Sequence, residues 1–253
     1  MTPRARSLFL AFRAVNWLTL DGAVNVRDLG GLPLQGGGST RTGVLVRADN
    51  LQGLSPRDVE ALQSLGLKLV VDLRTVEEIE LEGPGPLVGR IEHRNRSLHP
   101  EDGERTDVYV DDRDEARLVR MYMRYLRDRP DSIVEALRDV AYGDGAAIVH
   151  CAAGKDRTGM VVALALSAIG VEREAIVADY AATGERLLAI LERLKSSSTY
   201  ADDLEGVDDD VHVPRPETMH RVLSLVDASH GSPNDWLRSH GFADFDALRV
   251  RLT

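Results

Sequence analysis

Residues 146–159 read AAIVHCAAGKDRTG, and this stretch decides the fold of the chain. Its first four residues, Ala146 to Val149, form a compact apolar run that is typical of a strand buried on both faces. Arg157 to Ile169 is a strongly apolar segment of helical length, too short to cross a membrane. Gly154 lies between the two and favours a tight turn. The order predicts a central strand, a loop and a buried helix.

Two patterns upstream of this stretch extend the prediction to a βαβ arrangement. Ser55 and Pro56 have the N-cap and first-turn residue types of a helix, and Gly66 ends it. Leu67 to Leu73 is a nearly continuous apolar run, and Thr75 followed by Glu78 has the spacing of a capping box. We therefore predict an α/β fold with a central, mostly parallel sheet flanked by helices.

Weaker periodicity completes the expected element order. Further strands are predicted at 17–20, 43–48 and 91–98, and further helices at 114–129, 132–142, 172–194, 216–229, 233–239 and 243–252. The C-terminal half is thus α-rich, and its last three helices are expected to pack on the main core. We expect residues 1–253 to form a single domain with mobile loops at 99–113 and 196–212.

Charge and cysteine content exclude several classes of function. The net charge is −10, but residues 101–115 hold eight acidic residues and 202–210 hold six. The remainder of the chain is nearly neutral, which disfavours nucleic-acid binding over the whole surface. A single cysteine, Cys151, excludes a disulfide framework within the monomer and a cysteine-rich zinc site. The apolar stretch at 7–12 is too short for a signal peptide, so a cytoplasmic location is expected, although secretion by another route stays open.

The loop between the predicted strand and helix has the composition of an anion cradle. Backbone N–H groups at a helix N-terminus point toward one spot where the helix dipole favours negative charge. Arg157 adds a guanidinium that grips two oxygens of a tetrahedral anion. The same field stabilises a thiolate at Cys151, so the cradle favours its own nucleophile.

Two other interpretations fit the loop less well. A nucleotide-binding Walker A loop requires Ser or Thr after Gly-Lys, and Asp156 follows Lys155 here. A buried cysteine with only a packing role is common in proteins, but it does not explain the surrounding residues. No metal and no cofactor is therefore expected.

Cys151 and Arg157 are separated by five residues, and this spacing resembles the C-x5-R signature of the protein tyrosine phosphatase superfamily. The string from His150 to Gly159, together with Asn25 to Gly31 and Asp72 to Arg74, is similar to bacterial tyrosine/serine phosphatases of the HCxxGKDRTG type, typified by a mycobacterial enzyme. The similarity covers most of the chain. It implies a cysteine-phosphatase fold and a phosphate-binding loop made of Cys151, Ala152, Ala153, Gly154, Lys155, Asp156 and Arg157.

Chemical roles follow from the hydrolysis of a phosphate monoester. The Cys151 thiolate attacks phosphorus and forms a phosphocysteine, while Arg157 and the loop amides stabilise the phosphoryl oxygens. Thr158 is expected to bond to the sulfur. His150 is expected to fix the loop from its buried side rather than to transfer protons.

The general acid stays open among three candidates. Asp156 lies inside the cradle, and Asp72 ends a strand expected to neighbour Val149. The third candidate is a carboxylate of the acidic loop: Asp102, Asp107, Asp111 or Asp112. For Asp72 the alternative is an ion pair with Arg74.

The expected substrate is a phosphorylated protein or lipid. Phosphotyrosine peptide is ranked first, with phosphoserine and phosphoinositides as secondary substrates because Lys155 resembles the loop lysine of phosphoinositide phosphatases. A domain that binds phosphorylated partners without turnover is the alternative.

Arginines at 113, 117, 120, 124 and 127 fall on one face of a predicted helix. This arginine stripe is either a docking surface or, as we favour, an ordinary solvated face. The oligomeric state is not predicted.

Overall fold

The two apolar runs that flank the signature form the centre of the sheet. The computed structural model describes residues 15–83, 85–99 and 115–253. In it β4 (Leu67–Asp72) and β6 (Ala146–His150) pair in parallel, with Val70 opposite Ile148 and Asp72 opposite His150. Both strands are buried on both faces, apart from the exposed Lys68, as their uninterrupted apolar sequences predict. The carboxyl ends of the two strands therefore meet at one edge of the sheet.

The sheet has six strands in the order β1-β2-β3-β6-β4-β5. β3 (Leu45–Ala48) and β5 (Glu92–Asn95) add in parallel to either side of the central pair. β2 (Arg27–Asp28) and β1 (Asn16–Trp17) continue antiparallel beyond β3. The mostly parallel sheet is as predicted, but β2 was not predicted, because two residues give no periodicity and lie in a glycine-rich stretch.

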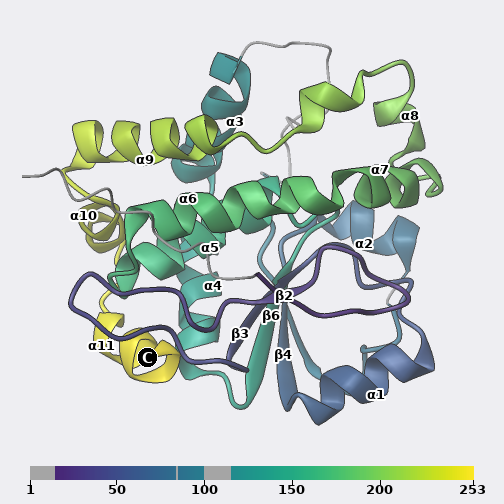
Figure 1. Ribbon diagram of the computed structural model, residues 1–253, viewed down its shortest axis with the longest axis horizontal. Helices are drawn as coiled ribbons and strands as arrows, with labels where there is room; N and C mark the ends of the chain where they lie inside the picture. Colours follow the sequence, from purple (N-terminus) through teal and green to yellow (C-terminus); the bar gives the residue numbers. More distant parts are fainter. Residues whose placement is uncertain (1–14, 84, 100–114) are drawn as a thin grey trace, which may run out of the picture.

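Helices cover the two faces unequally, as Figure 1 shows. One face packs mainly against α1 (Pro56–Ser64), through residues such as Val59, Val70 and Ile148. The other face is covered by a larger set whose residues share one hydrophobic cluster with Val149. This set comprises α3 (Glu115–Asp128), α4 (Pro130–Tyr142), α5 (Asp156–Ala168), α6 (Arg173–Ala182), α9 (Pro216–His230), α10 (Pro233–Ser239) and α11 (Phe245–Leu252). The last three helices thus contribute to the same core as β6.

Capping boxes form at both predicted N-caps, Ser55 and Thr75. Ser55 accepts a hydrogen bond from the Asp58 amide at the start of α1, and Thr75 does the same for Glu78 at the start of α2 (Val76–Glu82). In each case the N3 carboxylate bonds back to the N-cap amide. These caps fix where each helix begins after its preceding loop or strand.

The predicted long helix at 172–194 is divided. α6 ends at Ala182, a 3₁₀ turn η1 (Thr183–Arg186) follows, and α7 (Leu187–Lys195) continues. Residues 196–212 contain α8 (Ala201–Leu204) and a second 3₁₀ turn, η2 (Asp209–His212). Tyr200 and His212 are buried in this segment, which the sequence predicts as a loop.

Of the other predicted mobile loop, 99–113, only His99 is described, and it is buried. Residues 100–113, including the candidate acids Asp102, Asp107, Asp111 and Asp112, lie outside the described residues. Among the helices that are described, none is both long and apolar enough to span a bilayer.

Candidate active site

The signature forms a loop between the end of β6 at His150 and the start of α5 at Asp156. Cys151 follows the strand directly and is only 2% exposed. Gly154 has a φ of +65°, and a Cβ there would lie 2.4 Å from the carbonyl oxygen of Ala48. Glycine is required at this position because the backbone of the loop rests on the end of β3.

The peptide carbonyls of residues 152–154 point away from the interior of the loop, and each accepts a hydrogen bond from a residue outside it. Ala152 O accepts from the Asn50 amide at 2.9 Å and Ala153 O from Asn25 Nδ2 at 2.9 Å. Gly154 O accepts from Arg47 Nη2 at 2.6 Å. In a trans peptide the N–H points away from the C=O, so the amides that follow these carbonyls are turned to the opposite side. This is the arrangement that an anion cradle needs.

A buried charged cluster lies behind the loop. Arg27 and Arg47, both 0% exposed, share the carboxylate of Asp179 on α6 at 2.8 and 2.5 Å. Arg27 also bonds to Asn25 Oδ1 at 2.6 Å and Thr183 Oγ1 at 3.0 Å. Burial, followed by the charge of Arg47, lowers the pKa of Arg27 to about 10. The Arg27 guanidinium therefore remains charged at neutral pH.

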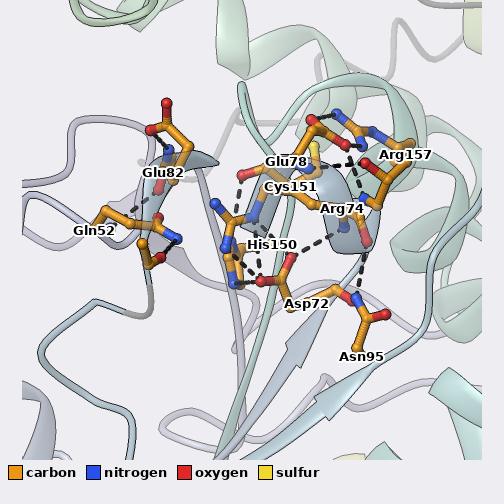
Figure 2. Close-up of polar contacts among 12 residues, drawn as sticks. Gln52, Asp72, Arg74, Glu78, Glu82, Asn95, His150, Cys151 and Arg157 are labelled. Atoms are coloured by element: carbon orange, nitrogen blue, oxygen red, sulfur yellow. Dashed lines mark hydrogen bonds and ion pairs between the residues drawn. The ribbon is translucent and has the colours of Figure 1, made fainter. Parts of the chain in front are cut away.

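Arg157 is held by a carboxylate from α2. Its Nη1 and Nη2 donate to Glu78 at 2.6 and 2.9 Å, and Figure 2 shows this pair next to Cys151. Tyr200 donates a third hydrogen bond to the same carboxylate at 3.1 Å. Glu78 is also the capping-box residue of α2, so the cap and the arginine are positioned by one side chain.

Asp72 and His150 occupy the adjoining ends of β4 and β6. Asp72 forms an ion pair with Arg74 at 2.5 Å, and its Oδ2 lies 3.5 Å from His150 Nε2 (Figure 2). Burial alone would raise the pKa of Asp72, but His150 and Arg74 lower it to about 2. Burial lowers the pKa of His150 to about 4, so this imidazole is neutral at pH 7. The predicted alternative for Asp72, an ion pair with Arg74, is present.

Asp156 is bonded by a buried tyrosine pair. Tyr122 on α3 donates to Asp156 Oδ1 at 2.5 Å, and Tyr180 on α6 lies 2.8 Å from the Tyr122 hydroxyl. Burial and the Asp156 charge raise the pKa of Tyr122 well above its usual value, so its hydroxyl stays protonated and donates. Lys155 Nζ lies 3.5 Å from the same carboxylate oxygen and donates to the carbonyl oxygen of His212 at 3.0 Å.

Residues 187–212, which we call the covering segment, pack over the loop. Ala152 and Ala153 share a small apolar cluster with Leu187, Ile190, Leu191, Leu194, Tyr200 and Leu204. Polar contacts from the covering segment reach the ends of β3 and α2, through Arg193 to Asp49 and Ser197 to Glu82. Cys151 itself is buried in the main hydrophobic cluster, together with Leu73 and Val149.

A cavity of about 300 Å³ lies beside the loop. His150, Asp72, Arg74 and Asn95 form its polar wall. Because Cys151 and Arg157 are not part of the lining, this cavity adjoins the phosphate loop from the side of β4 and β5.

The structure therefore brings together most of the predicted site residues. His150, Cys151, the loop residues 152–156, Arg157 and Asp72 lie at one edge of the sheet. Thr158 is fully buried, but within the described residues its hydroxyl has no hydrogen-bond partner, so the expected bond to the sulfur is not formed. No group of three or more metal-ligating side chains lies together in the described residues.

Several positioning residues were missed from the sequence. Glu78 was predicted only as a helix cap, and Tyr122 was not predicted to contact the loop. Arg47 is a charged residue within the otherwise apolar strand β3, and that mismatch is the signal that could have identified it. Arg27 and Asp179 lie in elements with other charged residues, so their neighbours give no such signal.

Comparison with known proteins assigns the family. Residues 18–253 match the model of the tyrosine phosphatase family. A Cupriavidus necator protein named a tyrosine-protein phosphatase is 30% identical over 92% of this chain and 86% of its own. A tyrosine-protein phosphatase of Nostoc commune is 31% identical (82% and 73% covered), and the triple specificity protein phosphatase PtpB of Mycobacterium tuberculosis is 26% identical (92% and 96% covered).

The chain belongs to the tyrosine phosphatase family. It is a phosphatase with a mixed, mostly parallel six-stranded sheet flanked by helices.

Proposed function

We propose that this phosphatase hydrolyses phosphotyrosine in proteins through a phosphocysteine intermediate on Cys151. The observation that carries the proposal is the orientation of the loop peptides. Their carbonyls are bonded outward by Asn50, Asn25 and Arg47, which leaves the amides and Arg157 to bind a phosphoryl group above the cysteine.

The reaction has two steps. The Cys151 thiolate attacks phosphorus while the bond from phosphorus to the substrate oxygen breaks, and that oxygen leaves with a proton from a general acid. Water then attacks the phosphocysteine, releases inorganic phosphate and returns the thiolate. Arg157 and the loop amides stabilise the three equatorial oxygens in both steps.

For the general acid we propose Asp156. It is the first residue of α5, it lies within the loop, and Tyr122 orients its carboxyl group. Asp72 is the weaker candidate, because a pKa of about 2 leaves it without a proton at neutral pH and Arg74 occupies both of its oxygens. The acidic-loop candidates stay a prediction.

His150 and Thr158 support the loop in this proposal. His150 is neutral, and its Nδ1 lies 3.3 Å from the carbonyl oxygen of Cys151, where it acts as a donor. Thr158 is buried one residue after Arg157, and rotation of its hydroxyl toward the sulfur would stabilise the leaving thiolate of the second step.

We rank phosphotyrosine peptides above phosphoserine and phosphoinositides as substrates. The relative from M. tuberculosis is named a triple specificity phosphatase, which supports a wider range than tyrosine alone. Lys155 was expected to meet a second negative charge of a phosphoinositide beside the bound phosphate. Its ammonium group donates to the carbonyl oxygen of His212, so it supports phosphoinositide activity less directly.

Hydrolysis of p-nitrophenyl phosphate by the wild-type protein and by Cys151→Ser tests the mechanism. We expect loss of at least about 10³-fold in the variant, since the serine hydroxyl is not ionised. Val149→Ile, a conservative change in the same strand, is the control for folding. Turnover that survives Cys151→Ser contradicts the cysteine mechanism, and a wild-type protein that binds phosphotyrosine without turnover identifies a binding module instead.

A further inference from the structure

Arg47 connects the core of the sheet to the phosphate loop. It is the third residue of β3 and is fully buried, and its Nη2 donates to Gly154 O at 2.6 Å. The next residue, Ala48, provides the backbone on which Gly154 rests. Two neighbouring residues of one strand therefore determine how the Gly154 peptide is oriented.

The partner of Arg47 is shared with a second arginine. Asp179 accepts from Arg47 Nη1 at 2.5 Å and from Arg27 Nε at 2.8 Å. Two guanidinium groups thus face one carboxylate. Glu185 also acts on Arg27, but its carboxylate is exposed and accepts from Trp17 Nε1, so water screens it.

Within the described residues, this cluster of two guanidinium groups and one carboxylate therefore carries a net positive charge in a buried environment. A buried charge without a counter-ion is unfavourable, and an anion placed nearby stabilises it. The loop directly above is where a cysteine thiolate and a phosphoryl group would lie. Among the described residues, Asp156 is a further carboxylate near this side of the loop, and it accepts a hydrogen bond from Tyr122.

A purely structural role explains this cluster poorly. Buried ion pairs are often no more stabilising than well-packed apolar residues of similar size. Within the described residues, Nε of Arg47 has no hydrogen-bond partner although it is buried, so the packing does not satisfy the whole guanidinium. The two groups of Arg47 that are satisfied bond to the loop and to Asp179.

We propose that Arg47 is a positioning residue for catalysis: it holds the Gly154 carbonyl outward and, with Arg27 and Asp179, places a net positive charge beneath the phosphate loop. This inference rests on the proposed cysteine mechanism. The charge favours the Cys151 thiolate in the free enzyme and the phosphoryl group in the complex, while the hydrogen bond sets the direction of the amide that follows Gly154.

Two substitutions separate the charge from the hydrogen bond. Arg47→Met removes both, and Arg47→Lys keeps the charge but cannot bond to Gly154 O and Asp179 in the fork geometry of a guanidinium. Arg138→Met is the matched control, because Arg138 also bonds to a glycine carbonyl, Gly241 O, and to carboxylates, but on the surface at α4.

Three readouts distinguish a positioning role from a structural one. They are the pH midpoint of Cys151 alkylation by iodoacetamide, the inhibition constant of vanadate, and kcat with KM on p-nitrophenyl phosphate. For Arg47→Met we expect the alkylation midpoint to rise by about one pH unit and vanadate to bind about 10-fold more weakly. For Arg47→Lys we expect a nearly unchanged midpoint with kcat lowered about 10-fold.

The inference is overturned if Arg47→Met matches Arg138→Met in alkylation midpoint and vanadate inhibition. If Arg47→Met does not fold, Arg47→Lys decides: unchanged kcat and vanadate inhibition in that variant also overturn it. Failure of the proposed function is separate, since it requires turnover that does not depend on Cys151.

Discussion

The two sides of the loop between β6 and α5 are held by different kinds of contact. Behind the loop, Asn25, Arg47 and the Asn50 amide donate to its peptide carbonyls. Asp179 on α6 in turn bonds to Arg47. In front, α2 and the covering segment meet it mainly through side chains, with Glu78 on Arg157 and Tyr200 on Glu78. The contacts behind the loop set the orientation of its peptides in the absence of substrate. The contacts in front hold the guanidinium of Arg157, which in the proposed mechanism binds the phosphoryl group.

The largest effect is expected from a change behind the loop. Gly154→Ala forces a side chain into the φ of +65° and places its Cβ 2.4 Å from Ala48 O. The left-handed conformation alone costs about 1–2 kcal/mol, and the overlap displaces the loop. We expect activity on p-nitrophenyl phosphate to fall about 10²-fold or more.

Gly206→Ala in the covering segment is the control for this change. Gly206 has a similar φ of +74°, but a Cβ added there would meet no atom within 4 Å. We expect it to lower the unfolding temperature with little change in kcat. Equal losses of activity in both variants would remove the distinction between back and front.

The second prediction concerns the acid. Asp156→Asn should lower kcat about 10²-fold on alkyl and tyrosyl phosphates, and far less on aryl phosphates whose leaving group needs no proton. Asp72→Asn leaves Arg74 without its counter-ion and should lower stability, with no dependence on the leaving group. Steady-state kinetics on both substrate types decide between the two, and a leaving-group dependence in Asp72→Asn would reassign the role.

The third prediction is a pH dependence of stability. The pKa of His150 is lowered from 6.5 to about 4 by burial, so the unfolded chain binds more protons than the folded one between these values. The free energy of unfolding should therefore fall as pH decreases from about 6.5 to about 4, by up to ~3 kcal/mol from this residue. Asp72, with a pKa of about 2, adds a further loss only below its unfolded value of 3.8.

Chemical denaturation at several pH values tests this effect. His150→Gln should show a shallower loss than the wild-type protein, and the remaining slope is expected from His212, whose pKa burial also lowers to about 4. His93→Gln on the exposed strand β5 is the control. An unchanged slope in His150→Gln would show that this imidazole is not buried in solution.

A smaller effect is expected in front of the loop. Tyr200→Phe removes one hydrogen bond to Glu78, worth about 1–3 kcal/mol because the acceptor is charged. We expect the unfolding temperature to fall by a few degrees and kcat/KM to change less than about 5-fold. Tyr142→Phe removes a comparable bond to Asp244 far from the loop. A loss of activity as large as that of Gly154→Ala would show that the front also sets the geometry.

The smallest effect is expected from the arginine stripe on α3. Arg120, Arg124 and Arg127 are exposed on the side opposite the buried Tyr122, while Arg113 lies outside the described residues. Reversal of Arg120 and Arg124 to Glu should leave kcat/KM on phosphotyrosine peptide and phosphoinositide monophosphate unchanged within about 2-fold. A selective loss on either substrate would identify the stripe as a docking surface, and phosphoinositides that exceed every phosphopeptide would reverse our ranking.

The sequence predicts the local structure of the site and misses its long-range contacts. The strand, loop and helix around Cys151, and the caps at Ser55 and Thr75, depend on neighbouring residues and were predicted. The contacts from Arg27 and Arg47 to Asp179 join residues 152 and 132 positions apart, and no local pattern encodes such a pairing. Short strands such as β2 and the turns of the covering segment likewise depend on tertiary packing.

Cys151 is the sole sulfhydryl of this chain and is covered in the structure. Oxidation of such a thiolate gives a sulfenic acid, and without a second thiol in the chain it cannot be captured as an internal disulfide. Only a sulfenamide with a backbone nitrogen or an external thiol would stop further, irreversible oxidation. Burial of Cys151 in the main hydrophobic cluster therefore also limits its access to peroxide, and in the proposed mechanism each exposure of the sulfur to substrate is also an exposure to peroxide.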